Sequence, residues 1–180
     1  MGLVHIYCGD GKGKTTAAVG LALRMAGNGR RVILVRFLKH EDSGEVHALR
    51  RIPGVDVLPC TEYFGFTWQM TVEEKRQAAK NCNRQFQEAW EMAVSLCESR
   101  ETDADVLLVL DEAAAALEHG FLELSGVLDC VDRRPPNLEM VFTGRRMPGE
   151  LLGRADYVTE MKEVCHPYAR GIRARRGIEY

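Results

Sequence analysis

The first sixteen residues constrain the fold more than any other part of the chain. An apolar run, residues 3–7 (LVHIY), leads directly into the glycine-rich stretch Gly9–Thr16 (GDGKGKTT). This order predicts a strand, a tight loop and the start of a helix. Glycines let backbone N–H groups approach an anion closely, and a helix N-terminus adds free donors and a positive dipole end. The stretch therefore predicts a P-loop that binds a nucleoside triphosphate.

The residues of this loop have expected roles. Lys14 can reach the terminal phosphates, and the Thr15 hydroxyl is placed to ligate Mg²⁺. The residues expected to bind the nucleotide are Gly9, Asp10, Gly11, Lys12, Gly13, Lys14, Thr15 and Thr16. Cys8 holds the position of the usual first glycine, which comes one residue late at Gly9. In such a loop the nucleotide need not lie in the usual direction, and a glycine-rich turn without a ligand is the alternative.

Length and composition fit one globular domain. The chain has 180 residues, of which 46% are hydrophobic and 28% charged, enough for a single α/β domain over residues 1–180. A net charge of −2 gives no overall attraction to nucleic acid or to an anionic membrane. Four arginines lie near the C-terminus, at Arg170, Arg173, Arg175 and Arg176. No module that reads nucleic acid accompanies them, so we expect this patch to bind an anionic ligand or to solvate the surface.

The cysteines and the apolar runs bear on the cellular compartment. The six cysteines are scattered and no pair has C-x-x-C spacing, which disfavours a zinc site. We expect a P-loop enzyme in a reducing cytosol rather than a disulfide framework, with most thiols buried as small apolar groups. The sequence has neither the pattern of a signal peptide nor an apolar run that could span a bilayer. The expected location is the cytoplasm, with no membrane partner.

Beyond the P-loop, apolar runs of strand type alternate with helical stretches, an order that predicts a mostly parallel sheet with helices on both faces. Thr71 and Glu74 form a capping box at the start of the longest expected helix. The expected strands are residues 3–7, 32–37, 55–58, 106–110, 138–142 and 157–161, and the expected helices are residues 14–26, 71–99, 122–131 and 148–155.

A second motif follows the strand at residues 106–110, where Asp111 and Glu112 succeed an apolar run and resemble a Walker B element. The carboxyl end of a parallel strand lies on the same edge of the sheet as the P-loop. Thr15, Asp111 and Glu112 are therefore the expected ligands of Mg²⁺, directly or through water. The alternative is an exposed acidic pair at the end of a strand.

Two further segments carry candidate site residues. The aromatic side chains of Gly65–Trp68 (GFTW) could form a face for a flat ligand, although the pattern alone favours packing of the loop on the core. Arg145, after another strand, would face the nucleotide edge and neutralise phosphate charge, with a solvated turn as the alternative. Lys39 is a similar but weaker candidate. His119 and His166 lack ligand-like spacing and are expected at the surface or in the core rather than in catalysis.

Taken in order, these segments resemble one family. GDGKGKTTAA is followed by Phe37-Leu38-Lys39, Gly65-Phe66-Thr67-Trp68, Leu110-Asp111-Glu112, Thr143-Gly144-Arg145 and the terminal Gly177-Ile178-Glu179-Tyr180. The chain resembles, over essentially its whole length, the P-loop type of ATP:corrinoid adenosyltransferase, in which the late first glycine is the usual form. The resemblance implies a RecA-like domain, a homodimer, and ATP bound in reverse so that its ribose C5′ faces the corrinoid. Cob(I)alamin or a related Co(I) corrinoid attacks that carbon, and triphosphate leaves.

The resemblance also implies roles for individual residues. The P-loop and Mg²⁺ would gather the charge that develops on triphosphate, with Lys14 and Arg145 on the leaving group. Phe66 and Trp68 match the aromatic pair that packs at the lower face of the corrin. This pair displaces the lower axial ligand so that Co(II) becomes easier to reduce, with a reduced flavoprotein as the expected electron donor.

One difference from better-known members is that the first expected strand begins only two residues after Met1, without the helical N-terminal extension that helps to cover their site. The cover is then expected to be absent, or to come from other segments or a partner. Two other functions stay open at this point: a P-loop ATPase or small-molecule kinase, which would form ADP, and a non-catalytic carrier of nucleotide or corrinoid. Adenosyl transfer is the favoured function, because the motifs that resemble the adenosyltransferase family span the chain.

Overall fold

A computed structural model describes residues 1–40, 42–60, 62–65, 67–99 and 105–179 of the chain. A six-stranded sheet with the order β3-β2-β4-β5-β1-β6 forms its centre, and all the strand pairs are parallel. The strands are β1 (Val4–Cys8), β2 (Arg31–Arg36), β3 (Val55–Val57), β4 (Val106–Asp111), β5 (Leu138–Thr143) and β6 (Tyr157–Glu160). The prediction of an α/β fold with a parallel sheet is confirmed.

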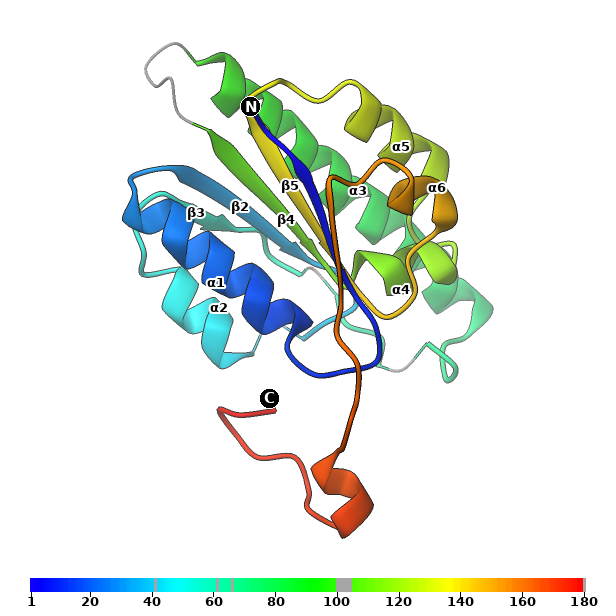
Figure 1. Ribbon diagram of the computed structural model, residues 1–180. Helices are drawn as coiled ribbons and strands as arrows, with labels where there is room; N and C mark the ends of the chain where they lie inside the picture. The colour runs from blue at the N-terminus through cyan, green and yellow to red at the C-terminus, as the bar shows by residue number, and fades with distance from the viewer. Residues whose placement is uncertain (41, 61, 66, 100–104, 180) are drawn as a thin grey trace.

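Helices cover both faces of the sheet (Figure 1). On one face lie α1 (Lys14–Gly27) and α2 (Gly44–Leu49), and on the other lie α3 (Val72–Glu98), α4 (Ala113–Glu118), α5 (Leu124–Asp132) and α6 (Gly149–Leu152). The α3 helix begins with the expected capping box, in which Thr71 Oγ1 accepts from the Glu74 backbone N–H and the Glu74 carboxylate accepts from the Thr71 backbone N–H. This exchange satisfies two backbone donors at the helix start.

Burial explains why the central strand is so apolar. All six residues of β4 are buried, because α3 packs on one face of this strand and α1 on the other. Two apolar clusters result. Leu108 and Leu110 join the α3 side, and Leu107 and Val109 join the α1 side. A strand buried on both faces is expected to read as a continuous apolar run rather than an alternating one, as residues 106–110 do.

The structure departs from the expected elements in two short helices, α2 and α4, which the sequence pattern did not predict. Each has six residues, too few for an apolar repeat of period 3.6 to be recognised. The helix expected over residues 148–155 is shorter, and α6 has only four residues, Gly149–Leu152. The other expected helices and strands are present with ends that differ by a few residues.

The segment after β6 leaves the body of the domain at the carboxyl edge of the sheet (Figure 1). Its described residues, 161–179, are mostly exposed and include a 3₁₀ turn, η1 (Pro167–Arg170). Within the described residues, no helix has both the length and the apolar character that crossing a membrane requires.

Candidate active site

The strand register brings the predicted motifs to one edge of the sheet. The β1 strand pairs with β5 so that Tyr7 lies beside Thr143, and β5 pairs with β4 up to Leu110. The P-loop after β1, Asp111 at the end of β4 and Arg145 just after β5 therefore meet at the carboxyl ends. A direct bond joins two of these segments, because the Gly9 N–H donates to the Arg145 backbone oxygen at 3.0 Å. Ligands of open parallel sheets bind at this edge.

The P-loop curls around the Lys14 side chain. Lys14 Nζ donates to the carbonyl oxygens of Gly9 and Gly11, each at 2.7 Å. Gly13, with φ of 117°, precedes α1 in the left-handed region that glycine adopts without strain. Thr16 is exposed in the first turn of the helix. The Lys14 ammonium thus lies within the loop, held by backbone oxygens that a phosphate group can replace.

Two of the P-loop glycines are required by the C-terminal segment. A Cβ on Gly9 would meet the Met161 carbonyl oxygen at 2.4 Å, and one on Gly11 would meet the Lys162 carbonyl carbon at 2.7 Å. The Gly11 N–H also donates to the Met161 oxygen at 2.8 Å. These glycines therefore allow residues 161–162 to pack directly on the loop. From the sequence, both glycines were expected only to bind phosphate.

Asp10 and Lys12 contact the same segment. Asp10 Oδ1 accepts a hydrogen bond from the Glu163 N–H at 3.1 Å, and this bond is the main reason that the pKa of Asp10 lies below its ordinary value. Lys12 Nζ donates to the Ile178 oxygen at 2.8 Å. Both side chains were expected to bind nucleotide, and here they fasten the P-loop to the C-terminal residues.

A network of hydroxyl and carboxylate groups centres on Asp111, which is fully buried. Its Oδ1 accepts hydrogen bonds from Thr15 Oγ1 at 2.8 Å and from Thr143 Oγ1 at 2.7 Å. Lys39 Nζ lies 2.6 Å from Asp111 Oδ2 and 3.7 Å from Glu112 Oε1. The structure thus brings Lys39 together with the three predicted metal ligands, Thr15, Asp111 and Glu112. Lys39 was predicted as a weaker candidate than Arg145 for neutralising phosphate charge.

The donor set of this network fits a hard divalent cation. Asp111, Glu112 and Thr15 offer two carboxylates and one hydroxyl, and Mg²⁺ prefers such oxygen ligands, with phosphate and water oxygens completing its shell. The Lys39 ammonium already stands among these oxygens as a cation. The residues that could hold Mg²⁺ are therefore Thr15, Asp111 and Glu112.

The backbone is strained on both sides of this network. In the described part of the chain, positive φ angles at non-glycine residues occur at Leu38 (56°) and Glu112 (59°). Leu38 immediately precedes Lys39, and Glu112 immediately follows Asp111. The Glu112 N–H donates to Thr143 Oγ1 at 2.9 Å, which helps to hold that conformation. Such outliers cost about 1–3 kcal/mol and tend to persist at functional sites.

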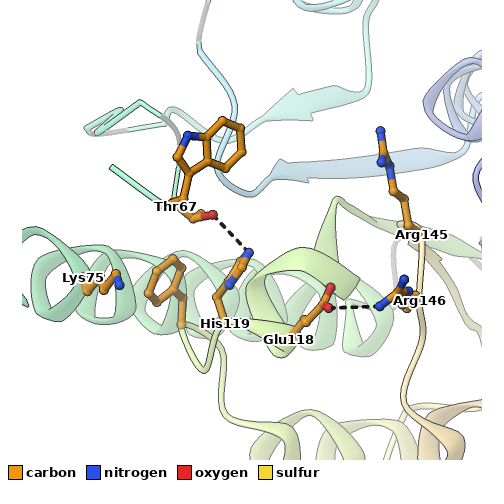
Figure 2. Close-up of a pocket in the computed structure, with 8 residues that line it drawn as sticks. Thr67, Lys75, Glu118, His119, Arg145 and Arg146 are labelled. Atoms are coloured by element: carbon orange, nitrogen blue, oxygen red, sulfur yellow. Dashed lines mark hydrogen bonds and ion pairs between the residues drawn. The ribbon is translucent and has the colours of Figure 1, made fainter. Parts of the chain in front are cut away.

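A pocket of about 520 Å³ lies beside the P-loop edge (Figure 2). In Figure 2, Arg145 and Arg146 lie on the side opposite Thr67. The Glu118 carboxylate pairs with Arg146 at 3.9 Å. The residues that line this pocket are Thr67, Trp68, Lys75, Glu118, His119, Phe121, Arg145 and Arg146. Arg145 therefore links the pocket to the P-loop through its backbone bond to Gly9.

The aromatic residues on the two sides of Gly65 divide between core and pocket. Phe64 packs against the apolar core, whereas Trp68 lines the pocket and is 74% exposed. Packing of the loop on the core, which the pattern alone favoured, therefore applies to Phe64 and not to Trp68. Phe66, the other predicted aromatic residue of the site, lies outside the described residues.

The pocket also contains residues that the sequence analysis did not select. His119 Nε2 lies 3.2 Å from Thr67 Oγ1, so the end of α4 contacts the Trp68 segment. Lys75 comes from the first turn of α3. For His119, the sequence gives only a spacing, because it follows Glu112 by seven residues, about two helical turns. This spacing indicates a common face only once α4 is known.

The P-loop, the buried aspartate at a strand end and the all-parallel sheet define a P-loop nucleotide-binding protein. A solved structure titled EssC (ATPases 2 and 3) from Geobacillus thermodenitrificans has the same fold, with a TM-score of 0.51 at 16% identity. The match covers 98% of this chain and 35% of that one. At this identity the likeness supports the fold alone.

Sequence comparison defines the protein more closely. Residues 1–180 match the family described as ATP:corrinoid adenosyltransferase BtuR/CobO/CobP. A corrinoid adenosyltransferase of Pseudomonas aeruginosa is 39% identical over 99% of this chain and 84% of its own length. Those of Escherichia coli K12 and Salmonella typhimurium are 32% and 33% identical, each over 99% of this chain and 86% of the relative. The chain belongs to the ATP:corrinoid adenosyltransferase family and is an enzyme of adenosyl transfer from ATP to a corrinoid.

Proposed function

We propose that this enzyme joins the 5′-deoxyadenosyl group of ATP to the Co(I) centre of a corrinoid at the carboxyl edge of the sheet, in the synthesis or salvage of adenosylcobalamin. The carrying observation is that one hydrogen bond, from the Gly9 N–H to the Arg145 oxygen, joins the P-loop to the pocket that contains Trp68. Co(I) attacks C5′, a Co–C bond forms, the C5′–O bond breaks, and triphosphate leaves with the electron pair of that bond.

The P-loop side of the site stabilises the leaving group. The Lys14 ammonium exchanges the carbonyl oxygens of Gly9 and Gly11 for phosphate oxygens, and the backbone N–H groups of the loop and α1 donate to the same anion. Arg145 brings a guanidinium from the pocket side. Preorganised donors aimed at developing charge are often the largest single contribution to catalysis.

Thr15, Asp111 and Glu112 are proposed to hold Mg²⁺. When bound, the ion would neutralise charge on the triphosphate and so make it a better leaving group. No general base is needed, because the nucleophile is the cobalt centre of the substrate and carries no proton to remove. Asp111, fully buried and fixed by two hydroxyl donors, is suited to binding and orienting rather than to proton transfer.

The pocket side is proposed to receive the corrinoid. Trp68 lines this pocket and is 74% exposed, and an exposed aromatic side chain suits a flat macrocycle. With Phe66, it would displace the lower axial ligand, so that Co(II) is more easily reduced and Co(I) is shielded from water.

The assembly, electron donor and location are part of the same proposal. We propose a homodimer, since the edge strand β6 exposes Tyr157 and Val158, each 52% exposed, and open edge strands favour association. A reduced flavoprotein is the proposed electron donor and the cytoplasm the proposed location, with neither nucleic acid nor membrane as a partner.

The deciding experiment is anaerobic incubation of the enzyme with MgATP and chemically reduced cob(I)alamin. The corrinoid spectrum and the phosphate product are followed together. Light-sensitive adenosylcobalamin with an equal amount of triphosphate supports the proposal. ADP without a new Co–C bond would instead indicate a phosphotransferase or ATPase, and tight binding without turnover a carrier.

A further inference from the structure

Lys39 holds the oxygen atoms that the proposed function assigns to Mg²⁺. Its Nζ lies 2.6 Å from Asp111 Oδ2 and 2.9 Å from Thr15 Oγ1, and 3.7 Å from Glu112 Oε1. We propose that the Lys39 ammonium is a displaceable counter-ion, which occupies the divalent-cation site of the nucleotide-free enzyme and leaves it when metal and triphosphate arrive together. This inference rests on the proposed function for the identity of the metal ligands.

The direction of the hydrogen bonds shows why the two cations compete. The Thr15 hydroxyl donates its proton to Asp111 Oδ1, so its lone-pair side faces the Lys39 ammonium, which donates to it. A metal ion bound to Thr15 would need that same side of the oxygen. Both cations would also use Asp111 Oδ2, and two positive charges on the same oxygen atoms repel each other.

Burial explains why the site needs a cation before the metal arrives. Asp111 is fully buried, and a buried carboxylate without a charged partner is strongly destabilising. The hydroxyls of Thr15 and Thr143 supply hydrogen bonds but no charge. Lys39 therefore makes the folded site possible in the absence of metal.

The backbone around Leu38 determines where Lys39 lies. The Phe37 N–H donates to the Asp111 backbone oxygen at 3.0 Å, which fixes the end of β2 against the end of β4. Leu38 then turns the chain with φ of 56°. Lys39 is the next residue, and its ammonium contacts the Asp111 carboxylate. A strained non-glycine residue at this point indicates that the position of Lys39 is maintained at a cost in stability.

The position of Lys39 suits a group that can be displaced. Its side chain is 25% exposed, against 1% for that of Asp111, so the ammonium lies at the outer side of the network. A lysine is a compact charge on a flexible stem, and an arriving triphosphate offers it a new anionic partner as the metal takes its place. Metal binding is then coupled to nucleotide binding. A metal ion alone would displace the Lys39 ammonium without giving it a new anionic partner, and triphosphate alone would lack the metal ion that neutralises its charge.

The test uses Mn²⁺ as the probe, titrated into the nucleotide-free enzyme and followed by electron paramagnetic resonance. Lys39→Met keeps an unbranched stem of similar shape and removes the ammonium group with its charge. It is expected to bind Mn²⁺ at least tenfold more tightly than the wild type. Lys162→Met is the matched control, since Lys162 pairs with the Glu160 carboxylate at 3.7 Å outside the network. It should bind Mn²⁺ as the wild type does.

A double variant tests whether the new affinity comes from this network. Lys39→Met with Asp111→Asn removes the buried carboxylate together with its counter-ion, and should return Mn²⁺ binding to the weak wild-type level. Equal Mn²⁺ affinity in Lys39→Met and wild type would overturn the inference. So would tight binding that persists in the double variant.

Thermal unfolding gives a second readout that does not depend on a stable variant. Mg²⁺ should raise the Tm of nucleotide-free Lys39→Met by about 3 °C or more and leave that of the wild type nearly unchanged. If Lys39→Met unfolds in metal-free buffer, Mg²⁺ should restore the folded state. Failure of Mg²⁺ to stabilise or restore this variant counts against the inference.

These measurements contain neither ATP nor a corrinoid, so they are independent of the transfer reaction. ADP as the product of the activity assay would overturn the proposed chemistry while leaving the Mn²⁺ result intact. Conversely, a normal yield of triphosphate with unchanged Mn²⁺ affinity in Lys39→Met would keep the reaction and remove only the counter-ion role.

Discussion

The buried hydroxyl of Thr143 donates a hydrogen bond to Asp111 Oδ1 at 2.7 Å, and neither residue is exposed to solvent. The same hydroxyl accepts from the Glu112 N–H at 2.9 Å. One side chain at the end of β5 therefore fixes both acidic residues at the end of β4. This relationship turns two neighbouring strand ends into one preorganised site.

Removing this hydroxyl should damage both stability and catalysis. Thr143→Val keeps the shape but removes one hydrogen-bond partner from a buried carboxylate oxygen and one from the partly buried Glu112 N–H. We expect the free energy of unfolding to fall by about 1–3 kcal/mol, measured by urea denaturation, and kcat with MgATP to fall while the enzyme remains folded. Thr159→Val, at an exposed position in β6, is the control. Equal losses in both variants would remove this role from Thr143.

Gly11 gives a test of the contact between the P-loop and the C-terminal segment. In Gly11→Ala, the new Cβ would lie 2.7 Å from the Lys162 carbonyl carbon, a distance that forces the segment away. We expect trypsin to cleave the arginine-rich C-terminal residues several-fold faster than in the wild type. Gly20→Ala, a helical position with nothing within 4 Å of the added Cβ, should not change this rate. It should raise stability slightly, by up to about 1 kcal/mol.

Burial of the cysteines predicts which thiols react. Burial raises the pKa of Cys82 to about 12, and that of Cys97 and Cys130 to about 11. At pH 8 these three groups are almost wholly protonated, and the thiolate is the nucleophile. Iodoacetamide at pH 8 should therefore modify the exposed Cys165 first, as read by peptide mass spectrometry. Rapid alkylation of Cys82 without denaturant would contradict this order, and unfolding in urea should make all the cysteines reactive.

Much of the fold could be predicted because its signals are local and repeated. The apolar run before Asp111 predicts a buried strand, and residues 3–16 predict strand, loop and helix in the right order. The short helix α4 could not be predicted in this way, because six residues leave no room for a recognisable helical period. Without this helix, nothing in the sequence placed His119 in the pocket, and it was expected at the surface or in the core.

The site was predictable where its chemistry lies in a motif and not where it depends on strand order. Asp111 and Thr15 follow from their motifs. The contact of Lys39 with both of them requires β2 to lie beside β4, which no local pattern states. The packing of Met161 on Gly9 links residues 152 positions apart. Such contacts between distant parts of the sequence form only in the folded tertiary structure.

The contact between Thr67 and His119 should position the aromatic segment. Because their side chains lie 3.2 Å apart, we expect His119→Ala to raise the KM for the corrinoid about threefold to tenfold and to leave the KM for ATP unchanged. In a double-mutant cycle with Thr67→Val, the two effects should be less than additive. His166→Ala, in the C-terminal segment, is the matched control. Fully additive effects would mean that the two residues act separately.

The aromatic pair itself separates the two halves of the reaction. Phe66→Ala with Trp68→Ala removes the proposed flat surface for the corrinoid while leaving the P-loop intact. We expect adenosylation starting from Co(II) and a reductant to fall by at least tenfold, because the lower axial ligand is no longer displaced. The Kd for MgATP, measured by calorimetry, should stay within about twofold of the wild type. Tyr168→Ala, which removes another exposed aromatic side chain at 77% exposure, should leave both quantities unchanged. Undiminished turnover from Co(II) in the double variant would show that the pocket works without its aromatic face, and would move the corrinoid site elsewhere.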